Sequence, residues 1–252
     1  MTALHPAFLA RPIAHRALHN VADGRPENSR AAIAAAMAHG YGIEIDLQLS
    51  ADGVAMVFHD YELDRLTFER GPVHLRTAGA LQQTTLRGGA QGIPALADVL
   101  EQVAGRVPLL IEIKDQDGAM GDNVGALEAA TAAELARYEG PVAVMSFNPH
   151  SVAEMARIAP DIARGITTCS YDPKDWPLLP ASRRDALRDI PDFDAVGASF
   201  ISHEARDLSR DRVQDLRDAG TPILCWTIRS PAAEAEARKI AQNVTFETYL
   251  PA

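Results

Sequence analysis

The stretch Ile43-Glu44-Ile45-Asp46-Leu47 decides the fold, because two acidic residues alternate in it with three apolar ones. Successive side chains of a β-strand point to opposite faces, so Glu44 and Asp46 share one face and the aliphatic side chains share the other. Neighbouring carboxylates in a buried strand repel each other and lose hydration, and a cation or a proton must offset that cost. An exposed strand with one polar face is the alternative interpretation of this stretch alone.

Three more apolar runs end in ionisable side chains: residues 13–16 in His15-Arg16, residues 54–60 in His59-Asp60 and residues 108–114 in Glu112-Ile113-Lys114. Polar groups gathered at the C-terminal ends of strands are typical of the active face of a (β/α)8 barrel. The four runs together therefore predict an α/β protein of the TIM-barrel class, with its functional side chains at one end of the barrel.

Length and composition are those of one large domain. The chain has 252 residues, 47% of them hydrophobic, and barrels of about 250 residues commonly form one domain. We therefore expect residues 1–252 to form a single TIM-barrel domain. The first residues lack the basic start and apolar core of a leader peptide, and no apolar run approaches the roughly 18 residues that span a bilayer. We expect a cytoplasmic protein in which Cys169 and Cys225 are buried thiols.

The charge balance limits the kinds of partner. The sequence has 24 basic and 34 acidic side chains, which gives a formal net charge of −10. Nucleic acids and anionic membranes are bound by basic surfaces, so neither is an expected partner, and no membrane insertion is expected. A small anionic substrate responds to the few charges and any metal in its pocket, so we expect a small-molecule substrate. The sequence leaves the oligomeric state open.

Strand and helix patterns alternate along the chain. Eight parallel strands are predicted at residues 12–16, 41–49, 107–113, 141–146, 163–168, 194–200, 222–228 and 243–247. The predicted helices run from an N-cap at Asn28 or Ser29 to His39, and over residues 95–104, 122–138, 149–159, 204–219 and 231–241. Residues 169–193 are rich in proline, and we expect mostly loop there with one short helix.

Residues 54–59 are predicted to form a β-hairpin arm after the second strand. Parallel neighbours need a crossover of about a dozen residues, whereas seven residues follow Asp46 before this run begins. Asp52-Gly53 is a strong two-residue hairpin turn, which returns the run antiparallel to the second strand and places His59 directly opposite Asp46. Residues 60–93 show no clean periodicity, and we expect them to form a small insertion over the C-terminal face of the barrel.

Three carboxylates at the strand ends indicate a metal site. Glu44, Asp46 and Glu112 offer hard oxygen ligands, which suit one divalent cation, either Mg2+ or Ca2+. The sequence has no CxxC or HExxH motif of the kind that would indicate zinc.

Basic and imidazole side chains beside these carboxylates indicate phosphoester chemistry. Arg16 and Lys114 together with a cation would neutralise a bound phosphate group. His15 and His59 suit a proton donor and a proton acceptor near neutral pH. These residues predict metal-dependent cleavage of a phosphodiester with two histidines as acid and base. The attacking group is either water or a neighbouring hydroxyl of the substrate, which would give a cyclic phosphate.

The order of the motifs resembles the glycerophosphodiester phosphodiesterase family of PLC-like, TIM-barrel phosphodiesterases. The matching motifs are His15-Arg16, Pro26-Glu27-Asn28-Ser29, Glu44-Ile45-Asp46, Asp52-Gly53, His59-Asp60, Leu63-Asp64-Arg65-Leu66-Thr67, Glu112-Ile113-Lys114 and Trp226-Thr227. The resemblance covers nearly the whole chain and implies hydrolysis of glycerophosphodiesters to an alcohol and sn-glycerol 3-phosphate. It implies the same roles as the residue chemistry does, with Glu44, Asp46 and Glu112 as metal ligands, His15 and His59 as the acid–base pair, and Arg16 and Lys114 as phosphate ligands.

Four residues depart from the usual pattern of that family. Ala17 stands where a glycine usually follows His-Arg, and Phe58 stands where a second histidine often precedes His-Asp. Arg229 takes the place of the usual asparagine, and Glu247 that of a common aspartate. None of the four is among the seven site residues, so the departures bear on substrate preference.

The remaining candidates are two aromatic residues and one histidine. Trp226 and Phe147 are predicted at strand ends facing the pocket, where they either contact the substrate or belong to the core. His203 is expected to be structural, with substrate contact as the alternative, and Asp115 is expected in solvent. A phospholipase D-like enzyme on lysolipids or sphingolipids is the alternative function, and the acidic composition gives it little support. A non-catalytic ligand-binding barrel is a further alternative, although every site histidine and carboxylate is present.

Overall fold

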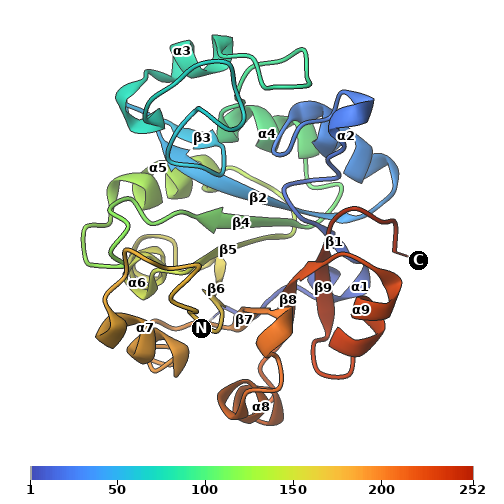
Figure 1. The fold of residues 1–252 in the computed structure, drawn as a ribbon, viewed down its shortest axis with the longest axis vertical. Coiled ribbons are helices and arrows are strands. Elements are labelled where there is room, and N and C mark those ends of the chain that lie inside the picture. The colour runs from blue at the N-terminus through green and yellow to red at the C-terminus, as the bar shows by residue number, and fades with distance from the viewer. Residues whose placement is uncertain (1, 252) are drawn as a thin grey trace.

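Eight parallel strands form a closed barrel in the computed structural model, which describes residues 2–251 (Figure 1). The strands are β1 (Ile13–Ala14), β2 (Gly42–Leu49), β4 (Leu109–Ile113), β5 (Val142–Ser146), β6 (Ala163–Thr168), β7 (Phe200–Glu204), β8 (Ile223–Ile228) and β9 (Asn243–Phe246). Their hydrogen-bonded order is β1-β9-β8-β7-β6-β5-β4-β2, and β1 also pairs with β2, which closes the ring. The predicted (β/α)8 TIM-barrel class is confirmed.

Helices between the strands form the outer layer of the barrel. They are α2 (Arg30–Ala38), α4 (Leu96–Val103), α5 (Ala126–Leu135), α6 (Pro149–Ile158), α7 (Ala181–Arg188), α8 (Asp211–Asp218) and α9 (Pro231–Ala237). Helix α4 buries an apolar stripe of Leu96, Val99, Leu100 and Val103 at helical spacing, whereas α7 and α9 each bury one apolar side chain. Ser29 is the N-cap of α2, and its Oγ accepts a hydrogen bond from Ala32 N at 3.1 Å. Over residues 2–251, every helix is too short or too polar to cross a bilayer.

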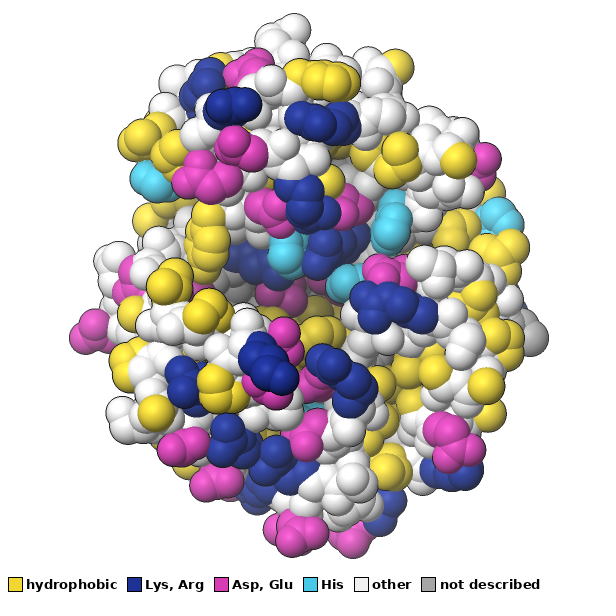
Figure 2. All heavy atoms as spheres, viewed as in Figure 1, with side chains coloured by type: hydrophobic (Ala, Val, Ile, Leu, Met, Phe, Trp, Pro, Cys, Tyr) yellow, Lys and Arg dark blue, Asp and Glu magenta, His cyan; other side chains and the backbone are white. Residues whose placement is uncertain are grey.

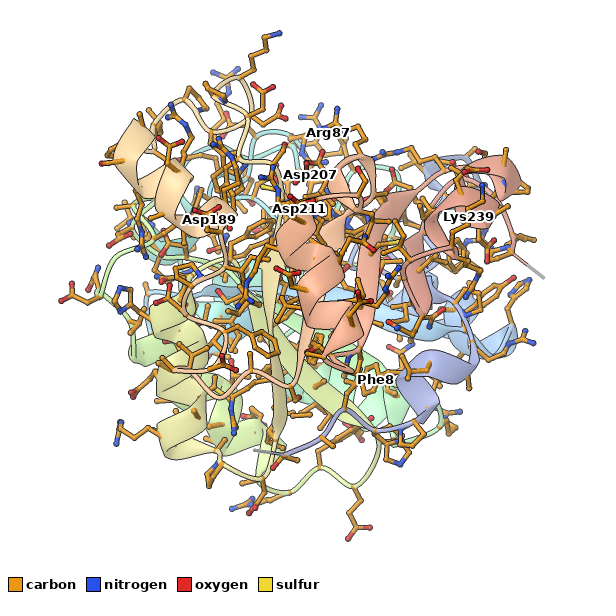
Figure 3. All side chains as sticks on the ribbon, turned by 90° about the horizontal axis from the view of Figure 1, so that it is seen from below. Phe8, Arg87, Asp189, Asp207, Asp211 and Lys239 are labelled. Atoms are coloured by element: carbon orange, nitrogen blue, oxygen red, sulfur yellow. The ribbon has the colours of Figure 1, made fainter. Side chains whose placement is uncertain are left out.

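The interior of the barrel is filled with apolar side chains from alternate strand positions, which leaves the C-terminal ends for polar groups. Phe200 of β7 lies against Gly165 of β6, where an added Cβ would come within 2.4 Å of the phenyl ring. Phe8 of the short helix α1 (Ala7–Ala10) belongs to the same interior cluster and is fully buried. Figure 3 shows Phe8 at the opposite end of the barrel from Arg87 and Asp207, so α1 covers the N-terminal end.

One strand and one helix differ from their predicted positions. The strand predicted at residues 194–200 is β7 at Phe200–Glu204, because Phe193, Val196 and Ala198 bury their side chains from a turn and not from a strand. The helix predicted at residues 204–219 is divided into a 3-10 turn, η3 (Ala205–Asp207), and α8. Apolar residues in a buried turn give the same sequence signal as a short buried strand.

The predicted arm is present, with a register one residue away from the prediction. Strand β3 (Ala55–Val57) pairs antiparallel with β2, and Phe58 N donates to Asp46 O at 2.9 Å. Phe58 therefore lies opposite Asp46, and the expectation that His59 occupies this position was wrong. The loop has three residues, 51–53, because Gly53 adopts a left-handed conformation with φ +79° and adds a bulge residue to the turn.

Residues 60–93 follow the β3 arm and lie at one side of the barrel (Figure 1). They contain a 3-10 turn, η2 (Val73–Leu75), and the short helix α3 (Ala78–Gln83). Their apolar side chains form a separate cluster that includes Met56 and Phe58 of the arm. We propose that this segment is an insertion within one barrel domain, because its apolar cluster is continuous with that of the β3 arm.

Candidate active site

A cavity of about 770 Å³ opens at the C-terminal ends of the strands. Figure 2 views the molecule from this side, where histidine, basic and acidic side chains gather around a hollow. Five residues predicted for the site line the cavity: His59, Glu112, Lys114, Phe147 and Trp226. Of the other four, Arg16, Glu44 and Asp46 are joined to it through Lys114 and the carboxylate cluster described next, and His15 is joined to it through Glu247 and Arg229.

The three predicted metal ligands lie together at the ends of β2 and β4. Glu44 and Asp46 are each 1% exposed and Glu112 is 7% exposed. In the parallel ladder Asp46 is the register partner of Glu112, so the strand pairing itself sets these two carboxylates side by side. One oxygen from each of the three side chains lies within 4.8 Å of the others.

Lys114 contacts two of the three carboxylates. Its Nζ lies 2.7 Å from Asp46 Oδ1 and 2.5 Å from Glu112 Oε1. Burial alone would lower the pKa of Lys114, but the charges of Asp46 and Glu112 raise it above its ordinary value. Burial would likewise raise the pKa of Asp46, and Lys114 is the main group that brings it below its usual range. Lys114 is therefore a permanent cation inside the cluster.

Glu44 is the carboxylate least compensated by basic groups. Burial raises its pKa well above the ordinary value, and the charges of Asp46 and Glu112 raise it further. The backbone N of Arg16 donates to Glu44 Oε2 at 2.8 Å and opposes this shift. Glu44 therefore favours its neutral form unless a further positive charge lies beside it, and the three acids offer only hard oxygen donors. This donor set fits a divalent cation such as Mg2+ or Ca2+.

Arg16 follows β1 in a left-handed turn that aims its side chain at the carboxylates. Its φ is +52° and that of Ala17 is +64°. Arg16 Nη1 donates to Glu27 Oε1 at 2.8 Å, and its Nε lies 3.7 Å from Asp46 Oδ2. This Nε is buried and has no hydrogen-bond partner among residues 2–251. A guanidinium with one unpaired buried N–H beside the cluster can donate to an anion that enters there.

His15 is held by a carboxylate from the last strand of the barrel. Its Nδ1 lies 2.9 Å from Glu247 Oε2, so Nδ1 carries the hydrogen and Nε2 is the free ring nitrogen. Burial lowers the pKa of His15, and the hydrogen bond to Glu247 partly opposes this shift. Glu247 is itself fixed by Arg229, whose Nε lies 2.5 Å from Glu247 Oε1, and His19 Nε2 lies 3.5 Å from Oε2.

His59 has the same arrangement on the other side of the site. Its Nδ1 lies 2.7 Å from Asp60 Oδ1, and Arg65 Nε donates to Asp60 Oδ2 at 2.6 Å. Burial would raise the pKa of Asp60, but hydrogen bonds from His59 and Arg65 bring it below the usual range. Gln48 Nε2 also donates to the backbone O of His59 at 3.1 Å. His59 therefore reaches the cavity although the β2–β3 ladder ends before it.

The wall of the cavity away from the carboxylates is aromatic. The ring of Phe147 lies 5.1 Å from that of Trp176 and 5.6 Å from that of Trp226, measured between centroids. Trp226 Nε1 donates to Ser202 O at 3.1 Å, which fixes the indole. Phe147 and Trp226 are thus both lining residues and part of a small aromatic cluster, the two interpretations that the sequence left open.

Several residues were placed differently or missed by the sequence analysis. Asp115 was expected in solvent, but it is 5% exposed and accepts from Asn148 Nδ2 at 2.8 Å. His203, by contrast, is structural as expected: it is fully buried, its Nδ1 lies 2.6 Å from Thr168 Oγ1, and it is not among the residues that line the cavity. The bond between Glu247 and His15 was missed, and the adjacency of the first and last barrel strands was the signal that could have indicated it.

The fold and this arrangement of side chains define a TIM-barrel enzyme with its site at the C-terminal face. The family model described as the glycerophosphoryl diester phosphodiesterase family matches residues 15–245, and the chain belongs to that family. It is accordingly a phosphodiesterase.

Individual relatives agree with this assignment. YhdW of Bacillus subtilis (strain 168), which carries a provisional name as a glycerophosphodiester phosphodiesterase, is 28% identical over 92% of this chain and 93% of its own length. A glycerophosphodiester phosphodiesterase of Bacillus altitudinis is 31% identical over 57% of this chain and 61% of its own. A phosphodiesterase of Oleispira antarctica, solved with the product sn-glycerol 3-phosphate, shares the fold with a TM-score of 0.77 at 23% identity, covering 96% of this chain and 94% of that one.

Proposed function

We propose that this chain hydrolyses small glycerophosphodiesters to an alcohol and sn-glycerol 3-phosphate, with the help of one divalent cation. The observation that carries the proposal is the carboxylate cluster of Glu44, Asp46 and Glu112 beside Lys114 and Arg16. Oxygen ligands, an ammonium and a guanidinium are the groups that bind and neutralise a phosphodiester. A relative solved with sn-glycerol 3-phosphate supports the identity of the product.

The cation would be held by Glu44, Asp46 and Glu112, whose hard oxygen donors suit Mg2+ or Ca2+. When bound, it supplies charge neutralisation at the phosphoryl oxygens. Arg16 and Lys114 bind the phosphate group from beside the cluster, and the unpaired Nε of Arg16 donates to one of its oxygens. These two residues orient the phosphorus for attack.

His15 and His59 carry out the proton transfers in this proposal. Each has its Nδ1 on a carboxylate, so each presents Nε2 as the ring nitrogen that exchanges a proton. One histidine removes the proton of the attacking hydroxyl as its oxygen bonds to phosphorus. The other donates a proton to the alcohol oxygen as its bond to phosphorus breaks. The nucleophile is water, or the neighbouring glycerol hydroxyl if a cyclic phosphate forms first.

Phe147 and Trp226 are proposed to contact the substrate at the apolar wall of the cavity. The cavity begins at His59, Glu112 and Lys114 and extends to these two rings, so a group attached to the phosphate would reach them. Aromatic surfaces of this kind favour the carbon skeleton of a ligand.

The test is release of sn-glycerol 3-phosphate from glycerophosphocholine and glycerophosphoethanolamine with Mg2+, with Ca2+ and with EDTA. We expect release only with a divalent cation, and its loss in His15→Ala and Glu44→Ala. Lys239→Ala serves as the control, because Lys239 is exposed and its ion pair within residues 2–251 is with Glu236, another exposed residue. Failure of the wild-type protein to cleave either diester with any metal would contradict the proposal.

Two further experiments test the alternative substrate class and the identity of the nucleophile. Lysophosphatidylcholine and sphingomyelin test the lipid-cleaving function, and faster turnover of either lipid than of the small diesters would replace the proposed substrate class. Rapid-quench samples examined by 31P NMR test the nucleophile. A transient cyclic glycerophosphate indicates attack by the substrate's own hydroxyl, and its absence indicates attack by water.

A further inference from the structure

Arg65 lies in the segment after the β3 arm, and its guanidinium contacts two carboxylates at once. Its Nε and Nη2 donate to the two oxygens of Asp60 at 2.6 and 2.7 Å. Its Nη1 and Nη2 donate to the two oxygens of Glu27 at 2.8 Å each. Arg65 thus forms two fork-shaped pairs on adjacent edges of one planar group, a geometry that only arginine provides.

Each carboxylate held by Arg65 holds a different group of the active site. Asp60 Oδ1 accepts from His59 Nδ1 at 2.7 Å. Glu27 Oε1 accepts from Arg16 Nη1 at 2.8 Å. A continuous chain of charged hydrogen bonds therefore runs from His59 through Asp60, Arg65 and Glu27 to Arg16, and Arg65 is its central member.

The hydrogen-bonded network connects three loops whose backbones are also held by other bonds, such as Asn28 N to Arg16 O at 2.9 Å and Gln48 Nε2 to His59 O at 3.1 Å, and it joins their side chains. Arg16 belongs to the turn after β1, Glu27 to the loop before α2, and His59 to the end of the arm. The β2–β3 ladder ends before His59, so strand pairing does not fix the position of this side chain. Asp60 and Glu27 have side-chain exposures of 22% and 11%, whereas the Arg65 side chain that joins them is 48% exposed.

We infer that Arg65 is a positioning residue that sets His59 and Arg16 at their working separation, one for proton transfer and one for phosphate binding. The inference rests on the proposed function of these two residues. It predicts that the two halves of this hydrogen-bond network, the Asp60 branch to His59 and the Glu27 branch to Arg16, affect different steps. Loss of the Asp60 branch disturbs His59 and hence the chemical step, whereas loss of the Glu27 branch disturbs Arg16 and hence substrate binding.

Three substitutions separate the branches in steady-state kinetics with glycerophosphocholine. We expect Asp60→Asn to lower kcat about tenfold or more with KM nearly unchanged, because a misplacement of about 1 Å can cost about a hundredfold in rate. Glu27→Gln should raise KM about fivefold or more with a smaller change in kcat. Arg65→Lys keeps the charge and loses both forks, so it should change kcat and KM together.

Arg76→Lys is the matched control. Arg76 lies in the same segment and pairs with Glu69 at 3.1 Å, so its replacement should leave kcat and KM within about twofold of wild type. The inference is overturned if Arg65→Lys also stays within that range. It is equally overturned if Asp60→Asn and Glu27→Gln change kcat and KM in the same proportion while lowering Tm, since that pattern reports only loss of structure.

A measurement without turnover keeps the inference separate from the proposed function. In 15N-resolved NMR spectra of the imidazole groups, Arg65→Lys should shift the His59 ring signals, and Arg76→Lys should leave them unchanged. An inactive wild-type protein would reject the proposed function, and the His59 signals would still test Arg65. Unshifted signals in Arg65→Lys would show that Arg65 does not position His59.

Discussion

At the scale of single residues, the two site histidines share one arrangement although one follows β1 and the other follows β3. His15 is paired with Glu247 and Arg229, and His59 is paired with Asp60 and Arg65. In each case a carboxylate accepts from Nδ1 and an arginine restrains the carboxylate. A fixed Nδ1–H leaves Nε2 as the free ring nitrogen, and this is the nitrogen that exchanges a proton in the proposed mechanism.

Glu247→Gln tests the first of these pairs. The amide retains the size of the side chain but loses the charge that accepts from His15 and binds Arg229. We expect kcat to fall about tenfold or more, because general acid–base catalysis contributes about 10²–10⁴-fold and depends on an oriented imidazole. Removing the charge should also lower the pKa of His15 further, since the bond to Glu247 opposes the effect of burial.

The control for this prediction is Arg206→Gln, another exposed arginine that lines the cavity and has no contact with either site histidine. Its effect on kcat should be smaller than that of Glu247→Gln. Equal kcat values for wild type and Glu247→Gln, measured at saturating diester, would contradict a role of Glu247 in orienting His15.

The sequence could predict the site groups themselves but not all of their partners. Local alternation identified Glu44 and Asp46, because the five residues 43–47 are enough to show that two acids share one face of a strand. Glu247 contacts His15 across 232 positions of sequence, and no local pattern records such a contact. Asp60 follows His59 directly in the sequence, but adjacency alone does not show that its carboxylate accepts from the imidazole ring.

At the scale of elements, the β3 arm illustrates how turn chemistry limits prediction. Asp52-Gly53 correctly indicated a hairpin, and the antiparallel direction is confirmed. The sequence does not distinguish a two-residue turn from a three-residue loop with a left-handed glycine, because both use the same Asp-Gly pair. One residue in the loop moves every partner in the ladder by one, so Phe58 and not His59 faces Asp46.

Gly165 of β6 provides a prediction at this scale. A Cβ added at Gly165 would lie 2.4 Å from the ring of Phe200 inside the barrel. We expect Gly165→Ala to destabilise the protein by about 1–3 kcal/mol, the usual cost of overpacking a core, as measured by urea unfolding. Gly79→Ala in α3 is the control, because nothing lies within 4 Å of its added Cβ and alanine favours a helix. Equal stability of the wild type and Gly165→Ala would contradict tight packing at this contact.

At the scale of the whole molecule, the alternation of strand and helix patterns was sufficient to predict a (β/α)8 barrel. Seven of the eight predicted barrel strands include the whole of the corresponding observed strand, and β7 is the exception. Its sequence ends in Ser202-His203-Glu204, three buried polar residues, of which His203 and Glu204 are hydrogen-bonded to Thr168 and Ser170. Burial of this kind depends on tertiary contacts such as that of His203 with Thr168, which hydropathy does not encode.

His203 also gives a prediction about global stability. Burial lowers its pKa from the ordinary value of 6.5, although Asp207 opposes the shift. Above pH 6.5 the ring is neutral in both the folded and the unfolded chain. As the pH falls below 6.5, the unfolded chain takes up the proton first, so the free energy of unfolding decreases until the lower pKa of the folded state is passed.

The measurement is urea unfolding of wild type and His203→Gln between pH 7 and pH 5. One proton of linkage corresponds to a slope of up to about 1.4 kcal/mol per pH unit. We expect a shallower slope in His203→Gln, even if that variant is less stable at every pH. Identical slopes would mean that His203 titrates alike in the folded and unfolded chain.

The closure of the barrel by β1 and β9 has a consequence for protein synthesis. The carboxylates of β2 and β4 leave the ribosome early, whereas Glu247 follows β9, the last strand to be made. Until that strand docks beside β1, His15 has no carboxylate to orient it. In the proposed mechanism, His15 would therefore acquire its orientation only when the first and last strands of the barrel meet, at the end of synthesis.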